Sequence, residues 1–539
     1  MASLRLAAFT VIAAAPWFFL RKAVGLPIVF DVVLLIALLA CAIRLKNEIV
    51  RSRWILIALA IAFALVWLGY GVRDGNQVRY YGLFAIDFGP LVSVVATLRA
   101  SPMLPLNIVA GSGPLNYHWL YFTLPAMFAD FMPASTALLI ANFLIAVLLV
   151  LTLSSIVRDQ RVVAIVIFAP LTLYYFQVIA PRLGIPPLTR NHLVLSPLNS
   201  MIVFGNNTFA LVLALLAIAQ LEKWNAEGRI ADLISGSIFL AAIIGYSVTL
   251  MIPLAITLMV WTLLGRVRRP LIAIVVAAVA GAIAIAIFFA IGILGHDASR
   301  HIAFAFDRGA FLLIAIVGML PLWTLLVLTL LEGRTPRPPG AARAALMRGW
   351  ADEGVRPSML RIHHVLIASC LFVPTFLYIA GSATGQFDMS MKIATLMVIA
   401  FAPLIEWPPL YGLVVVLLGL GQTAAYVAQF PYYRFTHATS HNVAIAADYH
   451  DALVWIRDHT PIDAVVEDPA SVPVWQVVFP TMIGERRVSM PTTYTRLYVI
   501  GTQRPARSEA TILVAHNDVN DPHWQLVHRS GEWTVCARR

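Results

Sequence analysis

The chain has 539 residues, of which 60% are hydrophobic and only 12% are charged, and its formal net charge is +11. A soluble protein carries about 25% charged residues, so this composition excludes a chain that faces water over most of its surface. Runs of about 20 apolar residues recur along the sequence, each long enough to cross a hydrocarbon core about 30 Å thick. In lipid such runs must be helices, because every backbone polar group needs an internal partner. The sequence therefore predicts a polytopic α-helical membrane protein.

Positive charges gather at the ends of the apolar runs, which is typical of membrane orientation rather than of nucleic acid binding. We therefore predict no nucleic acid partner and expect the basic segments in the cytoplasm, at 44–53, 158–161, 223–229, 266–269 and 332–361. This assignment places the N-terminus in the cytoplasm and the C-terminus outside. The predicted spans, about 13 in number, are 6–20, 24–43, 54–71, 134–157, 162–180, 201–221, two within 233–264, 272–294, 311–331, 365–379, 391–404 and 410–427.

The run 233–264 is about 32 residues long, which exceeds one untilted span at 1.5 Å per residue. Tyr246, Ser247, Thr249 and Pro253 interrupt it near the middle. We therefore expect two short helices with a turn near Ser247.

The first long outer loop, 72–133, is rich in glycine, proline and aromatic residues. Within it, Leu91, Val94, Val95 and Leu98 recur at helical spacing, which predicts a short amphipathic helix lying on the membrane surface. The segment 116–132 is aromatic and semi-polar, and we interpret it as a second interfacial helix. The alternative is that 116–132 is itself a span, but the basic segments after it would then lie outside.

From Pro431 onward, charged residues and turn residues increase and the long apolar runs stop. The segment 448–461 has the pattern of an amphipathic helix that ends at His459-Thr460-Pro461, and short strand-like segments follow it. About 110 residues suffice for a small α/β domain. We therefore divide the chain into a transmembrane domain, 1–430, and a soluble extracytoplasmic α/β domain, 431–539.

The cysteines and histidines do not indicate a metal centre. Cys41, Cys370 and Cys536 lie far apart and show no metal-ligand spacing. His296 and His301 are five residues apart, which is poor ligand geometry on a helix. We therefore predict no protein metal ligands.

Three features together resemble a known family. An acidic residue, Asp87, stands in the first outer loop, and the proline- and aromatic-rich stretch Gly113-Pro114-Leu115-Asn116-Tyr117-His118-Trp119-Leu120-Tyr121 follows it. A series of spans and an outer tail that contains ALVWIRDHTPIDAVV complete the pattern. This organisation resembles the GT-C superfamily of integral membrane glycosyltransferases, which includes protein mannosyltransferases, lipid A aminoarabinose transferases and the catalytic subunit of oligosaccharyltransferase.

The resemblance implies a GT-C-type enzyme, a hexosyl- or pentosyltransferase, in a bacterial inner membrane. Such an enzyme moves a sugar from a polyprenyl-phosphate donor to a glycan, lipid or protein acceptor on the outer face. Asp87 is then the candidate general base, since a carboxylate can accept the proton of an acceptor hydroxyl. Arginine forks fit the phosphate oxygens of the donor, and the candidate substrate-binding residues are Tyr117, His118, Arg182, Arg190, Arg300, His301 and Arg308.

The sequence also departs from the family. Many members carry two adjacent acids, or an acid followed closely by histidine, in the first loop, whereas Asp87 is followed by Phe-Gly-Pro. This departure argues against a metal-dependent mechanism, although a divalent cation stays open as a cofactor. Asp87 could also cap the helix that follows it, and His118 could be an interfacial aromatic-belt residue.

Two other classes of function stay open. A transporter or flippase of lipid-linked envelope intermediates would carry polar or charged residues within its spans, or inverted repeats. A non-catalytic envelope assembly protein would use the tail as its working part.

Overall fold

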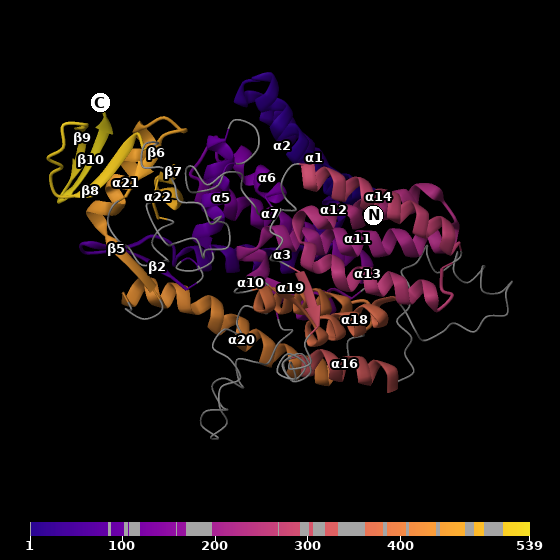
Figure 1. Ribbon diagram of the computed structural model, residues 1–539. Helices are drawn as coiled ribbons and strands as arrows, with labels where there is room; N and C mark the ends of the chain where they lie inside the picture. The colour runs from indigo at the N-terminus through magenta and orange to yellow at the C-terminus, as the bar shows by residue number, and fades with distance from the viewer. Residues whose placement is uncertain are drawn as a thin grey trace.

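The structure is a computed structural model of the whole chain. It describes residues 2–82, 84, 88–101, 106, 119–157, 159–168, 197–267, 269–290, 301–304, 319–331, 362–380, 385–405, 409–437, 442–468, 479–489 and 510–539. A body of packed helices makes up most of the described chain, and a smaller part with a β-sheet lies at one end of it (Figure 1). The fold is therefore mostly helical, as the composition predicts.

The helices of the body come from most of the chain. The N-terminal group is α1 (Ala2–Val24), η1 (Ile28–Asp31), α2 (Val32–Arg44) and α3 (Lys46–Trp67). The central group is α5 (Phe88–Ala100), η2 (Leu120–Phe122), α6 (Thr123–Phe128), α7 (Ala134–Ile156), α8 (Gln160–Phe168), α10 (Pro197–Val203) and α11 (Gly205–Glu227). The last group is α12 (Ile230–Tyr246), α13 (Val248–Leu263), α14 (Pro270–Ala290), α16 (Leu320–Leu331), α18 (Ile362–Phe376), α19 (Gly385–Phe401) and α20 (Pro409–Thr436).

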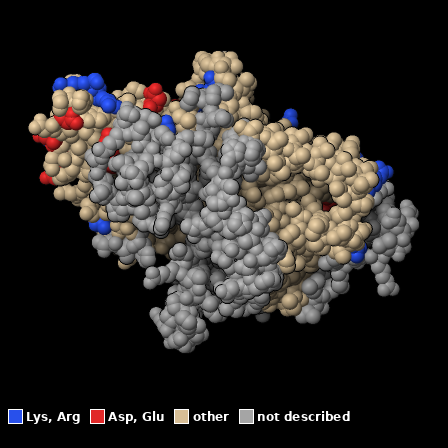
Figure 2. Space-filling model, viewed as in Figure 1, with Lys and Arg blue, Asp and Glu red and all other residues tan. Residues whose placement is uncertain are grey.

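Several described helices have the length and composition of membrane spans. Five of them qualify: Ala2–Val24, Lys46–Trp67, Ala134–Ile156, Gly205–Glu227 and Pro270–Phe288. Segment Pro270–Phe288 has a mean hydropathy of 3.0 and only 11% of it is buried, so aliphatic side chains such as Leu271 and Ile283 face outward. Figure 2 shows charged groups mainly over the sheet end and at the margins of the helical body, whose other visible described surface is mostly uncharged. These helices fit a lipid environment, and the total of about 13 spans stays a prediction.

The break predicted near Ser247 is confirmed. Helix α12 ends at Tyr246 and α13 begins at Val248, because Ser247 takes an extended conformation with φ −163° and ψ 92°. The side chain of Asn225 donates to the carbonyl of Arg266 over 2.8 Å, so the far ends of α11 and α13 meet. The long apolar run is therefore a tight hairpin of two short helices.

The described residues of the basic segments 44–53, 158–161 and 223–229 lie at the end of the helical body that is farther from the sheet, as the contacts of their neighbours show. Arg5, at the start of α1, pairs with Asp232 at the start of α12 over 3.2 Å. Ser52 of α3 donates to Ser154 near the end of α7 over 2.8 Å. The opposite end of α1 reaches Asp130, just before α7 begins. The orientation of the chain in the membrane stays a prediction.

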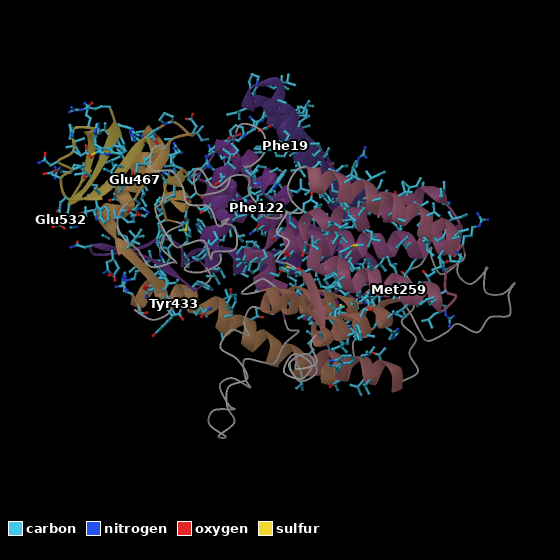
Figure 3. All side chains as sticks on the ribbon, viewed as in Figure 1. Phe19, Phe122, Met259, Tyr433, Glu467 and Glu532 are labelled. Carbon is cyan, nitrogen blue, oxygen red and sulfur yellow. The ribbon has the colours of Figure 1, made fainter. Side chains whose placement is uncertain are left out.

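Two β-structures join distant parts of the chain. Strands β1 (Val72–Asp74) and β2 (Gln77–Tyr81) form a hairpin, and β2 also pairs antiparallel with β5 (Asn442–Ala446). The Tyr433 ring of α20 stacks on Tyr81, with 5.0 Å between the ring centroids, beside this small sheet (Figure 3). Strands β3 (His301–Phe304) and β4 (Leu377–Ala380) pair separately. The first loop and the tail thus lie on the same side.

The tail forms a five-stranded sheet in the order β7-β6-β8-β10-β9. Strands β7, β6 and β8 run parallel and β10 and β9 complete it antiparallel. Its elements are α21 (Ala447–His459), β6 (Val465–Glu467), α22 (Phe479–Met482), β7 (Arg487–Ser489), β8 (Ile512–His516), β9 (Trp524–Ser530) and β10 (Trp533–Arg538). The predicted amphipathic helix is confirmed as α21, and Leu453 and Ile456 on it are fully buried.

Helix α5 corrects one prediction. The helix forms where the spacing indicates, but it does not lie on the membrane surface with a polar face outward. Leu91 and Val95 are buried and so are Ser93 and Thr97 on the other side, because α6 and α7 of the body and α22 of the tail enclose it. The second predicted interfacial helix, 116–132, contains η2 and α6. These two helices together cover only Leu120–Phe128, which is too short to cross a bilayer.

Gly205 marks a position where packing leaves no space for a side chain. A Cβ atom there would lie 2.2 Å from both the Asn142 Oδ1 and the Tyr121 hydroxyl, which are joined by a 2.7 Å hydrogen bond. We expect Gly205→Ala to cost about 1–3 kcal/mol through overpacking and to lower the thermal denaturation midpoint in detergent. Gly281→Ala is the matched control, since no heavy atom lies within 4 Å of its Cβ. Equal midpoints for the two variants would contradict this account.

Candidate functional site

Most residues that the sequence singles out for chemistry lie outside the described residues. These are Asp87, Tyr117, His118, Arg182, Arg190, Arg300 and Arg308. His301 is the first residue of β3, where its backbone pairs with Ala380, and its side chain is outside the description. The described structure therefore brings no two of these side chains together, and the site is built from their described neighbours.

Aromatic packing fixes the N-terminal end of α5. Phe88, which directly follows Asp87, is fully buried. Its ring centroid lies 5.1 Å from that of Phe84, 6.0 Å from Tyr70 and 6.3 Å from Trp67. Tyr70 and Trp67 stack on one another at 4.4 Å at the end of α3. The residue after Asp87 is thus anchored to a membrane helix by edge-to-face contacts.

An ion pair fixes the C-terminal end of α5. The Arg99 guanidinium donates through Nε to Asp130 over 3.2 Å and through Nη1 to Glu485 over 2.6 Å. Asp130 lies in the turn between α6 and α7, and Glu485 lies in the tail. Both carboxylates are almost buried, with 9% and 3% of their side chains exposed. One arginine thus joins three parts of the chain.

The ion pairs continue to the first helix. Arg21, in the last turn of α1, lies 3.0 Å from the other oxygen of Asp130 and 3.1 Å from Asp31 of η1. The ammonium of Lys22 donates to the carbonyls of Leu98 and Arg99, which are among the last of α5, and a cation there also suits the helix dipole. We call Arg21, Asp31, Arg99, Asp130 and Glu485 the ion-pair network.

The turn that carries Glu485 is tightly constrained. Glu485 has φ +51°, a left-handed conformation that residues other than glycine rarely adopt. A Cβ on Gly484 would lie 2.5 Å from the carbonyl oxygen of Pro480. Glu485 also accepts the backbone N–H of Ala134 at the start of α7 over 2.7 Å. The turn thus packs against the helical body. The Glu485 carboxylate accepts hydrogen bonds from Arg99 of α5 and from the first residue of α7.

Arg486 holds the same turn from the tail side. Its guanidinium donates to the carbonyls of Arg457, Thr460 and Glu485 over 2.6–3.0 Å, and to the Thr460 hydroxyl over 3.1 Å. Burial lowers the pKa of Arg486 to about 10, so it stays charged at neutral pH. Burial also raises the pKa of Glu485 above that of an ordinary carboxyl, while the Ala134 N–H and the arginines around it oppose that shift. The turn is therefore a place where charge is held away from water.

A cavity of about 420 Å³ opens beside this turn. Arginines line much of it, namely Arg99, Arg457 and Arg486, together with the carboxylates of Asp458 and Glu485. We call it the cationic cavity. Met132, Pro133 and Ile462 form an apolar part of its wall. It lies between the helical body and the tail, at the C-terminal end of α5.

No metal site accompanies the cavity in the part of the chain that the structure describes. No group of three or more His, Cys, Asp and Glu side chains could hold an ion there. Cys41, Cys370 and Cys536 are buried and unbridged. A divalent cation therefore stays open as a cofactor.

No protein-family model matches the chain, and no curated protein sequence matches it either.

The ion-pair network makes a direct prediction about stability. Asp130→Asn removes the carboxylate that Arg21 and Arg99 share and leaves both cations short of a counter-charge. We expect a loss of about 3–5 kcal/mol and a lower midpoint of thermal denaturation in detergent. Asp159→Asn is the control, because its pair with Arg161 is exposed, at 31% and 62% of the side chains, and should contribute less than about 1 kcal/mol. An unchanged midpoint for Asp130→Asn would disprove the structural role of the network.

Proposed function

We propose that this protein is a GT-C-type membrane glycosyltransferase. It transfers a hexose or pentose from a polyprenyl-phosphate donor to a cell-envelope acceptor on the outer face of a bacterial inner membrane, with Asp87 as general base. The resemblance of the first loop and of its surroundings to that superfamily is the starting point of the proposal.

The observation that carries the proposal is the way in which α5 is held. A general base must stay within hydrogen-bond reach of the proton that it takes, and catalytic groups need rigid supports. The helix that follows Asp87 is anchored to α3 by aromatic packing at Phe88. Arg99 anchors it to the tail and to the turn between α6 and α7, and Lys22 links it to α1. A loop residue that only capped a surface helix would need neither anchor.

The proposal places the first loop and the tail outside the cell. Pairing of β2 with β5 puts both on one side of the helical body. This favours the predicted topology, in which the segments rich in arginine and lysine lie in the cytoplasm. The donor and the acceptor would then meet on the outer face, where a polyprenyl-phosphate sugar presents its head group.

Cysteine labelling tests this topology. Asp518→Cys, in the exposed part of the tail, should react with a membrane-impermeant maleimide on intact spheroplasts. Arg161→Cys, exposed at the opposite end of the helical body, should react only after the membrane is opened. The three native cysteines are buried and give a low background. Labelling of Arg161→Cys on intact spheroplasts would overturn the proposed orientation.

The chemical role of Asp87 is tested by Asp87→Asn. Asparagine caps a helix as well as aspartate does, but it cannot accept a proton as a general base. Purified protein in nanodiscs is incubated with polyprenyl-phosphate hexoses and pentoses and with envelope glycan fragments, and released polyprenyl phosphate is measured. We expect activity with one donor and a loss of about 100-fold or more in Asp87→Asn.

The control for this assay is Asp159→Asn, which changes an exposed carboxylate at the other end of the helical body. It should keep full activity. Equal rates for Asp87→Asn and the unmodified protein would remove Asp87 as the base. Absence of release from every donor would remove the glycosyltransferase proposal itself.

A further inference from the structure

The cationic cavity is not explained by the proposed reaction. Phe88, beside Asp87, lies at one end of α5 and Arg99 at the other, and 13 helical residues separate the two ends by about 18 Å. The cavity opens at the Arg99 end. Its arginines therefore have a role other than contact with a group that reacts at Asp87.

The arginines of the cavity are only partly occupied. Arg99 uses Nε and Nη1 for Asp130 and Glu485, and Arg457 uses Nε and Nη2 for Asp458. Within the described chain, Nη2 of Arg99 and Nη1 of Arg457 have no hydrogen-bond partner. The side chains of Arg99 and Arg457 are 16% and 25% exposed, so both guanidinium groups are partly buried. Partly buried guanidinium groups with spare donors suit a multivalent oxyanion.

The charge of the cavity also points to an anion. Its lining holds three arginines and two carboxylates. With the adjoining Arg21, Lys22, Asp31 and Asp130, the count is five cations to four carboxylates, so one positive charge is left over. The Glu485 carboxylate already accepts hydrogen bonds from Arg99 and from the Ala134 N–H. Arg486 gives its donors to carbonyls and a hydroxyl rather than to a carboxylate. Its charge is therefore not cancelled by direct pairing and adds to the field in the cavity.

We propose that the cationic cavity is a binding site for a phosphate group, held mainly by Arg99 and Arg457. Phosphate accepts paired hydrogen bonds from the planar arginine fork, and a volume of about 420 Å³ holds such a group with part of the molecule that carries it. This site is separate from the Asp87 end of α5 and does not depend on the proposed transfer reaction.

The apolar wall indicates what carries the phosphate. Met132, Pro133 and Ile462 face the cavity, and 38% of Ile462 is exposed. Phe131, next to Met132, is 55% exposed although it is large and apolar. An amphiphile with a phosphate head and a hydrocarbon tail would cover both parts, whereas inorganic phosphate would use the arginines alone.

Binding is tested with n-dodecyl phosphate added to the full-length protein in uncharged maltoside micelles, with dodecanol and inorganic phosphate as separate probes. The dissociation constant is measured by titration of intrinsic tryptophan fluorescence or by the shift in denaturation midpoint. We expect dodecyl phosphate to bind and dodecanol not to bind. Tighter binding of dodecyl phosphate than of inorganic phosphate identifies a lipid-borne phosphate, and equal binding identifies free phosphate as the ligand.

Two variants move the affinity in opposite directions. Arg457→Gln should weaken dodecyl phosphate binding about tenfold or more, since a charge-assisted hydrogen bond is lost. Asp458→Asn removes the carboxylate that competes for Arg457 and is 47% exposed, so it should tighten binding several-fold. A tighter complex cannot result from misfolding.

Arg161→Gln, at the far end of the helical body, serves as the matched control and should bind as the unmodified protein does. Asp87→Asn should also bind normally, which separates failure of this proposal from failure of the transferase proposal. Binding that is absent, or that is the same in Arg457→Gln and Asp458→Asn as in the unmodified protein, overturns the phosphate site.

Discussion

The bridge that Arg99 makes between Asp130 and Glu485 is the contact on which the rest of the arrangement depends. Two nearly buried carboxylates on different parts of the chain need a shared cation, and Arg99 supplies it over 3.2 and 2.6 Å. Removing Asp130 or Glu485 leaves Arg99 with one carboxylate instead of two, in a place from which water is largely excluded. The same contacts therefore determine the positions of α5, of the start of α7 and of the tail.

This coupling means that α5 is held by two different kinds of contact. Helix α5 is short and wholly enclosed, yet it is fastened by apolar packing at one end and by charge at the other. Aromatic contacts are tolerant of small shifts, whereas hydrogen-bonded ion pairs have defined directions. The proposed catalytic residue precedes the apolar end, and the proposed phosphate site lies at the charged end. One rigid helix thus separates two chemistries by a fixed length.

Local pattern was sufficient for those parts of the fold that local forces decide. The interruption at Ser247 and the helix α21 were predictable because helix breaks and amphipathic spacing are properties of neighbouring residues. The enclosure of α5 was not, because its covering comes from the tail. Arg99 has the appearance of an interfacial residue and Glu485 of a solvated one. Their pairing joins residues that are far apart in the chain, and the spacing of apolar residues within a helix or strand does not predict such a contact. Asp87 was selected by resemblance alone, and its surroundings stay a prediction.

The tail position of Glu485 has a consequence for synthesis. Arg99 and its partner are 386 residues apart in the chain. At elongation rates of about 5–20 residues per second, Arg99 is synthesised roughly 20–80 seconds before Glu485. During that interval the guanidinium of Arg99 can pair only with Asp130, water or lipid head groups. Strand β2 likewise has no β5 to pair with. The contacts of the first loop and of α5 with the tail can therefore form only after the last part of the chain has been made.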